Sequence, residues 1–486
     1  MAAILAIDEG TTGVRAYLFD AEGRLLAGAY REISATYPQP GWVEQDPVAI
    51  WEATLAVSRT ALARAGSSAR DLAAIGVCTQ RATIVVWERA SGQPVYPAIV
   101  WQDTRTAERA AQLAQQGIFT NAMASATKLE WILDHVPDAR TRAARGELLC
   151  GTVDSWLVWN LTGGSAHVTD HSNASCTTLY DPFQGCWWNH ALETLGIPDA
   201  MLPELRASSE VYGVTVAQLF GVPVPVASVA GDQQAALFGE LGWHKGAAKI
   251  TLGTSGMADL NTGPEAAFSP HGAYPLVLWS VGNERPFCLE GTVIAAGAAV
   301  QWLRDAVGLL ERIEDASAVA ASVPDSGGVW AVPAFQGLGT PYMEAGARAV
   351  IGGLSRGAGR AHIVRAVLEG IAYRCREVLT TLYGDVGLPM PPRLRVDGGA
   401  AANDFLLQSL ADVLGIEVER PESVQASVLG AAYLAGLATG VWQSREALLH
   451  HWKSGGVFAP RWSASEREER FAAWQRAIAA ARLGGL

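Results

Sequence analysis

Short apolar runs bounded by glycine, aspartate or proline alternate along this chain with longer segments whose apolar residues have helical spacing. This alternation is typical of β-strands connected by α-helices. The chain begins with three predicted strands, "AILAID", "VRAYLFD" and "RLLAGAYRE", joined by the turns "EGTTG" and "AEG". We therefore predict a mixed α/β fold that opens with a β-hairpin.

A second hairpin of the same kind is predicted in the middle of the chain, where "AAKITL" leads through "GTSG" into "MADLNTG". Residues 10–13 and 253–256 thus form similar glycine-rich turns in similar hairpins, which is a weak internal repeat. A chain of 486 residues with 49% hydrophobic residues is long enough for two or three domains. The repeat predicts two halves, residues 1–245 and 246–486.

Charge and cysteine usage narrow the functional class. A net charge of -12 without a block of lysine or arginine disfavours nucleic acid and anionic membranes as partners. The six cysteines are scattered, with no C-x-x-C pair, which fits neither a zinc site nor a disulfide framework. The N-terminus lacks the basic region of a signal peptide, and no apolar run has the length of a membrane span. We therefore expect a soluble protein of the reducing cytoplasm.

The two glycine-threonine turns suit phosphate. Glycine allows backbone N–H groups to approach an anion closely, and threonine hydroxyls add neutral donors. A single turn of this kind is more often an ordinary hairpin turn. Two copies that open two halves favour a polyphosphate bound between them.

A third glycine-rich turn follows the predicted strand at residues 394–396. The helix after it has its apolar residues at helical spacing (Leu406, Leu410, Val413 and Leu414). Gly399 would let a flat base or a ribose lie against the backbone, and Asn403 could bond to it. The alternative is a tight strand-to-helix turn that needs glycine for steric reasons.

Asp232 lies in "AGDQQAALFG", directly after the apolar run "VPVPVASV". An aspartate between a strand and a helix can cap a helix that begins at Gln233, because its carboxylate accepts hydrogen bonds from free N–H groups of the first turn. The motif alone does not distinguish this role from a catalytic one.

Nine segments, taken in order, resemble segments of the FGGY carbohydrate kinases, and among these most closely the members that phosphorylate glycerol. They are "DEGTTGVRAYLFD", "YPQPGWVEQDP", "PAIVWQDTRT", "GTVDSWLVWNLT", "ASSEVYG", "AGDQQAALFG", "VPAFQGLGTPY", "GLSRGAGRAHIVRAVLEGIAYR" and "VDGGAAANDF". In the eighth segment, His362, Arg365 and Glu369 are expected to serve helix packing and salt bridging.

The resemblance implies two domains of the ribonuclease-H-like, actin-like ATPase fold with a cleft between them, the first mainly for substrate and the second mainly for ATP. It implies Mg²⁺ held at Asp8. It assigns the following residues to ATP and its phosphates: Thr11, Thr12, Arg15, Thr254, Gly297, Gln301, Gly399 and Asn403. It assigns the following residues to a small polyol or sugar: Arg81, Trp101, Asp232 and Gln233.

Phosphoryl transfer to an alcohol requires positioning, neutralisation of phosphate charge, and a group that accepts the hydroxyl proton. In this interpretation Asp232 is that catalytic group, and it can also cap the helix. Magnesium at Asp8 and the donors of the two turns would stabilise the developing charge.

Three positions depart from the glycerol-phosphorylating pattern. Ala82 stands where a glutamate binds the substrate hydroxyls, Met123 replaces a tyrosine, and Met257 replaces an aromatic residue. The substrate class therefore remains a small polyol or sugar, and a four- or five-carbon polyol or ketose of the erythritol, xylulose or ribulose type is an alternative to glycerol. Some of the glycerol-phosphorylating members bind the inhibitor fructose bisphosphate through an arginine-containing, glycine-rich loop before the catalytic aspartate. Residues 207–243 of this chain contain neither lysine nor arginine, so this kind of inhibition is not expected.

Two alternatives come from other functional classes. A nucleotide-binding regulator on an actin-like fold, or an ATPase of the chaperone or filament type, would keep the phosphate turns but would have no use for Arg81, Trp101, Asp232 and Gln233. The presence of these four residues favours a kinase. The sequence leaves the oligomeric state open and allows a homo-oligomer.

Overall fold

The computed structural model describes residues 2–118, 120–422 and 425–483. The chain separates into two compact units. Unit 1 comprises Met1–Gly239, Leu276–Pro286 and Ser427–His451, and unit 2 comprises Glu240–Pro275, Phe287–Ala426 and Trp452–Leu486. The first long segment of unit 1 thus ends shortly before the boundary expected at residue 245. A single boundary does not represent the two later segments that unit 1 also contains.

Unit 1 is built on a six-stranded sheet with the strand order β14-β15-β6-β1-β2-β3. The strands are β1 (Ala3–Gly10), β2 (Gly13–Phe19), β3 (Leu25–Glu32), β6 (Leu72–Thr79), β14 (Ser209–Val214) and β15 (Pro225–Gly231). The first three strands are antiparallel, as the sequence predicts, whereas β6 is parallel to both β1 and β15. The carboxyl ends of β1, β6 and β15 therefore meet at one edge of the sheet.

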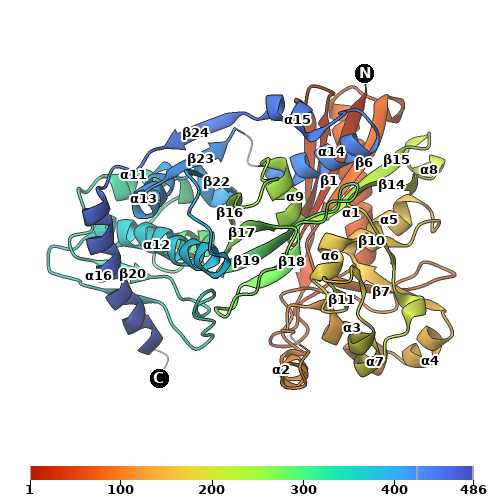
Figure 1. The fold of residues 1–486 in the computed structure, drawn as a ribbon, viewed down its shortest axis with the longest axis horizontal. Coiled ribbons are helices and arrows are strands. Elements are labelled where there is room, and N and C mark those ends of the chain that lie inside the picture. Colours follow the sequence, from red (N-terminus) through yellow and green to blue (C-terminus); the bar gives the residue numbers. More distant parts are fainter. Residues whose placement is uncertain (1, 119, 423–424, 484–486) are drawn as a thin grey trace. The chain divides into compact units, whose positions relative to one another are not determined.

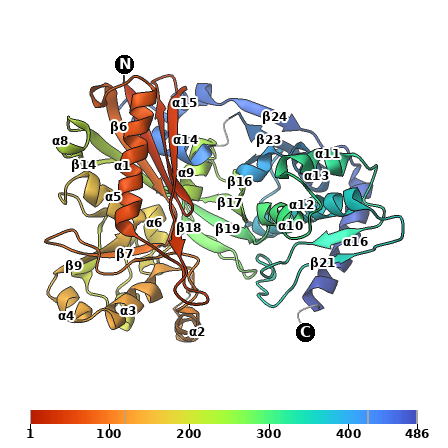
Figure 2. The same ribbon diagram turned by 180° about the vertical axis from the view of Figure 1, so that it is seen from behind.

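A five-stranded sheet and several helices complete unit 1. The second sheet has the order β4-β5-β8-β7-β9, with β4 (Ala35–Thr36), β5 (Glu44–Gln45), β7 (Ile84–Glu88), β8 (Ala98–Ile99) and β9 (Leu148–Thr152). The longer helices are α1 (Pro47–Arg64), α2 (Ala107–Gln115), α3 (Ser125–His135), α5 (Val153–Leu161) and α9 (Asp232–Gly239). Helix α1 covers one face of the first sheet (Figure 2), and Asp46 caps it by accepting the Val48 N–H at 2.9 Å.

A late segment of the chain returns to unit 1 as helix α14 (Ala426–Ala438), which Figure 1 shows beside β1 and β6. The contact is close because two glycines remove side chains from it. A β-carbon at Gly76 would lie 2.4 Å from the carbonyl oxygen of Ala431, and one at Gly430 would lie 1.8 Å from that of Ala235. The Ser228 hydroxyl also donates to the Ala431 carbonyl at 2.8 Å. This packing brings the start of α14 to the end of β1.

Unit 2 repeats the strand arrangement of unit 1. Six of its strands follow the order β19-β17-β16-β22-β23-β24. They are β16 (Ala248–Leu252), β17 (Gly256–Gly263), β19 (Phe287–Val293), β22 (Arg393–Asp397), β23 (Glu417–Pro421) and β24 (Ser454–Phe458). Three antiparallel strands again come first, β16 and β23 are each parallel to β22, and β24 is antiparallel to β23. The internal repeat seen in the two hairpins thus extends over both main sheets.

The helices of unit 2 pack around α12 (Arg360–Val386), whose buried face includes Val364, Leu368, Ile371 and Leu379. The others are α10 (Gly297–Asp305), α11 (Ala316–Ala321), α13 (Asp404–Leu414) and α16 (Ala464–Leu483). The structural roles expected on α12 are confirmed. Arg365 pairs with Glu369 at 2.8 Å, and the Gly359 N–H donates to Nδ1 of His362 at 3.1 Å.

Two further expectations concern the cysteines and the membrane. All six cysteines are free thiols, four of them buried. In the described part of the chain no helix is both long and apolar enough to cross a bilayer. The four buried cysteines therefore contribute to packing as small apolar side chains.

His167 is a half-buried titratable group in unit 1. Its Nε2 lies 2.9 Å from the Cys150 carbonyl oxygen, and its ring meets the Trp87 ring edge-on at 5.3 Å. Burial lowers the pKa of His167 to about 4. The folded protein therefore holds this imidazole neutral, whereas the unfolded chain protonates it below pH 6.5.

We predict that His167 destabilises the fold as the pH falls. Between pH 6.5 and 4 the unfolded state binds the extra proton, so stability is lost on acidification, by up to about 3 kcal/mol. His167→Gln should flatten the dependence of the unfolding free energy on pH in this range, measured by urea titration. His190→Gln, at an exposed position, is the control. Equal slopes for wild type and His167→Gln would contradict the prediction.

Candidate active site

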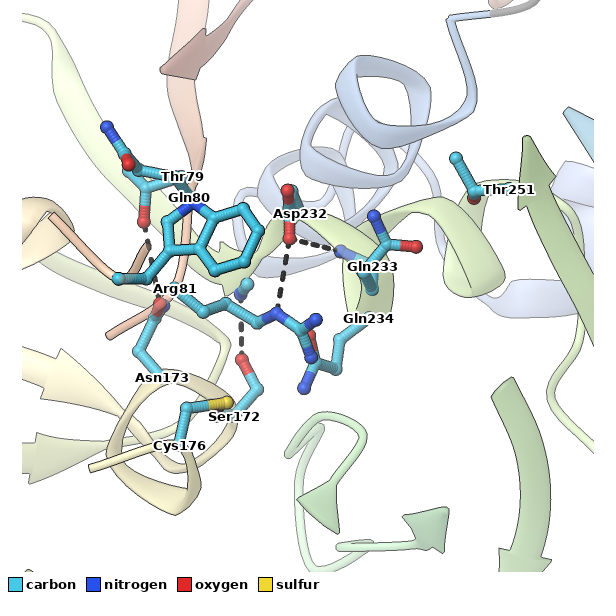
Figure 3. Close-up of polar contacts among 12 residues, drawn as sticks. Thr79, Gln80, Arg81, Ser172, Asn173, Cys176, Asp232, Gln233, Gln234 and Thr251 are labelled. Carbon is cyan, nitrogen blue, oxygen red and sulfur yellow. Dashed lines mark hydrogen bonds and ion pairs between the residues drawn. The ribbon is translucent and has the colours of Figure 1, made fainter. Parts of the chain in front are cut away.

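Asp232 is the first residue of α9 and directly follows the last residue of β15. The helix thus begins one residue earlier than expected. Oδ1 of Asp232 accepts the Gln233 N–H at 2.8 Å and lies 3.3 Å from Nε of Arg81 (Figure 3). The carboxylate therefore satisfies one free donor of the first helical turn and pairs with a guanidinium, while 31% of the side chain stays exposed.

Arg81 reaches Asp232 because β6 and β15 are parallel neighbours. Gly231 at the end of β15 is paired with Thr79 at the end of β6, so the residues that follow the two strands emerge side by side. A β-carbon at Gly231 would lie 2.8 Å from Cδ of Arg81 and 2.5 Å from Oε1 of Gln234. Only glycine leaves room there for both side chains.

The strand end of β15 is also fixed from α6 (His171–Ser175). The Gly231 N–H donates to the Ser172 hydroxyl at 2.9 Å, and the Thr79 hydroxyl lies 3.5 Å from Oδ1 of Asn173 (Figure 3). Ser172 is itself held by a 2.7 Å hydrogen bond to Asp170. The backbone that carries Asp232 is therefore anchored on both sides.

Asp8 lies near the end of β1, next to β6 in the same sheet. Its side chain is 3.8 Å from the guanidinium of Arg15, which is its cross-strand partner on β2, and it accepts the Ser427 hydroxyl at 2.9 Å. Burial raises the pKa of the Asp8 carboxyl; Arg15 and Ser427 lower it, whereas the charge of Asp232 raises it. A cation near Asp8 would favour its ionised form.

The first glycine-threonine turn is a two-residue hairpin loop, because Gly10 pairs with Gly13 and leaves Thr11 and Thr12 between them. Trp101 donates from its indole nitrogen to the Thr11 hydroxyl at 2.8 Å. Gln45 donates to the Thr11 carbonyl at 2.7 Å. Trp101, expected as an apolar wall, thus also fixes a residue of the expected phosphate turn.

Sequence reasoning missed a buried polar network beneath this turn. Gln80 donates to Oε1 of Glu9 at 3.1 Å and to Oε1 of Gln45 at 3.0 Å, and it accepts from the Thr83 hydroxyl at 2.8 Å. Glu9 is fully buried, and burial raises the pKa of its carboxyl well above its usual range. The sequence signal for this network was the presence of glutamine and glutamate at the ends of apolar strands. Such side chains are buried with the strands and must then be hydrogen-bonded.

The two altered substrate-side positions of unit 1, Ala82 and Met123, lie beside the start of α3. Ala82 is buried and has a φ of 61°, in the left-handed region that favours glycine. Its carbonyl accepts the hydroxyl of Ser125, the first residue of α3, at 3.0 Å. Met123 lies two residues before that helix, and its N–H donates to Asn121 at 2.8 Å. The start of α3 therefore holds Ala82, whereas Met123 is held by Asn121 in the segment that leads into this helix.

In unit 2 three expected nucleotide-side segments converge on the second turn. The Ala298 N–H donates to the Thr254 carbonyl at 3.0 Å, and the Gly297 N–H donates to the Gly253 carbonyl at 2.8 Å. A β-carbon at Gly297 would lie 2.6 Å from the same Gly253 oxygen. The start of α10 is therefore in direct contact with the turn, and glycine is required for this approach.

The third glycine-rich turn packs against the end of β16, directly before the second turn. Gly398 has a φ of +87°, and a β-carbon there would lie 2.6 Å from the Leu252 carbonyl oxygen, whereas one at Gly399 would meet no neighbour within 4 Å. Gly398 thus fulfils the steric role that the sequence left open, and the backbone at Gly399 is open. Asn403 caps α13 by accepting the Leu406 N–H at 3.0 Å.

The remaining two predicted positions lie on neighbouring elements of unit 2. Gln301 is an exposed residue of α10, and Met257 is paired with Thr251 on β16. The expected nucleotide residues Thr254, Gly297 and Gly399 thus belong to one unit, whereas Asp8, Thr11, Thr12, Arg15 and the substrate-side residues belong to the other.

Two units that repeat one strand order, each with a glycine-rich hairpin turn beside its parallel strands, define a two-domain α/β protein with an actin-like ATPase fold. The structure of Plasmodium falciparum glycerol kinase with ADP matches with a TM-score of 0.93 at 29% identity, covering 99% of this chain and 98% of that one. A ligand-bound xylulose kinase from Lactobacillus acidophilus matches with a TM-score of 0.85 at 20% identity, covering 99% of each chain, which supports the fold alone.

The family follows from the sequence matches. The N-terminal domain of the FGGY family of carbohydrate kinases matches residues 3–239, and the C-terminal domain of that family matches residues 248–439. A glycerol kinase of Symbiobacterium thermophilum is 48% identical over 489 aligned residues, covering 99% of this chain and 98% of that protein. The chain belongs to the FGGY family of carbohydrate kinases. It is an ATP-dependent kinase that acts on an alcohol group of a small polyol or sugar.

We predict that Gly398→Ala destabilises the protein by about 2 kcal/mol or more, because the new methyl group would meet the Leu252 backbone and the left-handed conformation is strained for alanine. Urea unfolding measures the effect. Gly384→Ala is the matched control, since Gly384 lies in α12 with no neighbour near its β-position, and there alanine should stabilise by about 0.5–1 kcal/mol. Equal effects of the two substitutions would show that the close approach at Gly398 is unimportant.

Proposed function

We propose that Asp232 accepts the proton of a polyol hydroxyl as that hydroxyl attacks the terminal phosphate of ATP. The observation that supports this role is the ion pair between Asp232 and Arg81 at the carboxyl ends of two parallel strands. Ligands of open α/β sheets bind at such strand ends. The carboxylate is partly exposed, so it is accessible to a hydroxyl group, and its geometry is fixed by Gln233 N–H and by Arg81.

A positioned carboxylate contributes in two ways. It orients the nucleophilic hydroxyl through a hydrogen bond, and it takes the proton as the phosphate ester forms. In the proposal Arg81 and Gln233 bind neighbouring hydroxyls, and Trp101 contributes a wall. The intact substrate side argues against a nucleotide-binding regulator, which would need only the phosphate turns.

We propose that Asp8 holds Mg²⁺ on ATP. Among the residues that the structure describes, no group of three or more His, Cys, Asp or Glu side chains could hold a metal ion by itself. Mg²⁺ usually retains several waters and binds through one or two carboxylates together with substrate phosphates, so a single buried carboxylate fits this ion. When bound, the ion would neutralise phosphate charge, while Thr11, Thr12, Arg15 and Thr254 would donate to the phosphate oxygens.

The proposed nucleotide site of unit 2 consists of the second turn, the start of α10 and the turn at Gly399, with Gln301 and Asn403 nearby. The open space at Gly399 supports contact with a flat base or ribose. The Plasmodium falciparum glycerol kinase structure is a structure with ADP, which supports an adenine nucleotide as the ligand. The six free thiols support the expected reducing cytoplasm as the location.

The acceptor is proposed to be a small polyol, with glycerol and a four- or five-carbon polyol or ketose as the competing candidates. The full-length relatives named as glycerol kinases favour glycerol. Ala82 and Met123 favour a longer acceptor, because neither side chain offers the directed hydrogen bonds of glutamate or tyrosine. Losing a hydrogen bond to a charged group costs about 1.5–3 kcal/mol, or about one to two factors of ten in affinity.

We predict that Asp232→Asn lowers kcat about a hundredfold or more while the protein stays folded and binds ATP, because asparagine still accepts the Gln233 N–H but is a poor base. Steady-state ADP release and thermal unfolding measure the two effects. Asp46→Asn is the matched control, since Asp46 also bonds to a first-turn N–H, on α1. If Asp232→Asn keeps the wild-type kcat, the proton-acceptor role is wrong.

We predict that a four- or five-carbon polyol or ketose has a higher kcat/KM than glycerol, and that Ala82→Glu combined with Met123→Tyr shifts the preference toward glycerol. A coupled ADP-release screen over triols, tetritols, pentitols and ketopentoses measures both. Ala82→Gly is the control, because it relaxes the left-handed backbone without adding a hydrogen-bonding group. If glycerol exceeds every longer acceptor, the chain is a glycerol kinase with unusual contacts.

A further inference from the structure

Lys128 is a fully buried lysine on α3, within unit 1. Its Nζ donates to the Trp101 carbonyl at 3.1 Å and to the Met123 carbonyl at 2.9 Å. Trp101 follows β8 and lies 27 residues before Lys128, whereas Met123 lies in the segment that leads into α3; both are positions of the proposed polyol site. One buried amine thus connects two sides of that site.

Burying a lysine costs free energy because its amine loses contact with water. The hydrogen bonds that the amine donates must therefore compensate for this cost. Burial lowers the pKa of Lys128 to about 7; nearby Asp103 opposes this shift and Arg105 adds to it. A neutral amine has two N–H donors, the same number as the carbonyl acceptors that it contacts. A methionine or leucine would fill the space without the desolvation cost but would leave both carbonyls without this donor.

The same end of α3 also holds Ala82, another position of the proposed polyol site. Ser125, three residues before Lys128, donates to the Ala82 carbonyl at 3.0 Å. Trp101 is fixed at two further points, because its N–H donates to the Thr83 hydroxyl at 3.1 Å and its indole donates to Thr11 at 2.8 Å. Lys128 therefore provides the contact that connects this fixed tryptophan to the segment of Met123.

We propose that Lys128 is a positioning residue that sets the spacing of Trp101 and Met123 and thereby the choice of acceptor. This inference rests on the proposed function, because it takes both residues as parts of the polyol site. Lys128 acts through the two backbone carbonyls and not by touching the reacting atoms. Its loss should therefore weaken recognition of the acceptor and leave ATP recognition unchanged.

The test compares Lys128→Met with wild type in the full-length chain. For the acceptor that the screen ranks first, KM should rise about tenfold, the kcat/KM ratio between that acceptor and glycerol should narrow, and KM for ATP should change less than twofold. Hydrogen exchange followed by mass spectrometry should show faster exchange in peptides that contain Trp101 or Met123. Unchanged acceptor KM and exchange, or an equal rise in both KM values, would overturn the proposal.

Thr127→Val is the matched control, because it removes a 2.8 Å hydrogen bond to Thr106 from the same helix without touching Trp101 or Met123. It should leave the acceptor ratio and the exchange of both peptides unchanged; a change equal to that of Lys128→Met would make the effect a general one of α3. Lys128→Gln retains a neutral donor and should give intermediate values. If neither Lys128 variant folds, the residue serves folding alone and the proposal is wrong. A wild type that phosphorylates no polyol overturns the proposed function, while the exchange result still decides the positioning role.

Discussion

The parallel pairing of β6 with both β1 and β15 is the constraint on which the proposed chemistry of unit 1 depends. Parallel neighbours end at the same edge of a sheet, so this pairing brings Asp8, Arg81 and Asp232 to one edge although they are far apart in the sequence. Glycine at positions 76, 231 and 430 allows the side chains and α14 to pack tightly against these strands. The carboxylates are thus placed by backbone geometry first and by side-chain contacts second.

Unit 2 repeats this strand order, but other groups surround its hairpin turn. Its hairpin turn at residues 253–255 is contacted by the start of α10 at Gly297, and the turn at Gly398 packs against Leu252, directly before the hairpin turn. Both close approaches require a glycine. Asp8 and Asp232 lie near strand ends of unit 1, whereas the turns of unit 2 at residues 253–255 and 398–399 consist of glycine, threonine and serine. The proposed function thereby assigns proton transfer to unit 1 and nucleotide binding to unit 2.

Both units contain a lysine that is fully buried, and the two lysines have different partners. Lys249 lies on the strand before the second turn, where it pairs with Asp259 at 2.9 Å and donates to Thr251 at 2.7 Å. Lys128 instead contacts two backbone carbonyls. The ion pair connects the adjacent strands β16 and β17, whereas the carbonyl contacts connect the segments of Trp101 and Met123. Buried polar groups are retained in both places because removing one partner leaves the other unsatisfied.

The sequence by itself determined the mixed α/β class, both hairpins and the family, because period-two strands and glycine turns are local patterns and nine ordered motifs are specific. It also identified Asp232 and Arg81 as candidates. It did not reveal Gln45, Gln80 or Lys128, since each has a partner in a segment distant in the chain: Gln45 and Gln80 contact each other, and Lys128 contacts Trp101. Nor did it reveal that residues 427–451 pack with the first unit. Only the tertiary structure decided these features, because strand order and the burial of polar groups are set by which distant segments pack together and not by local spacing.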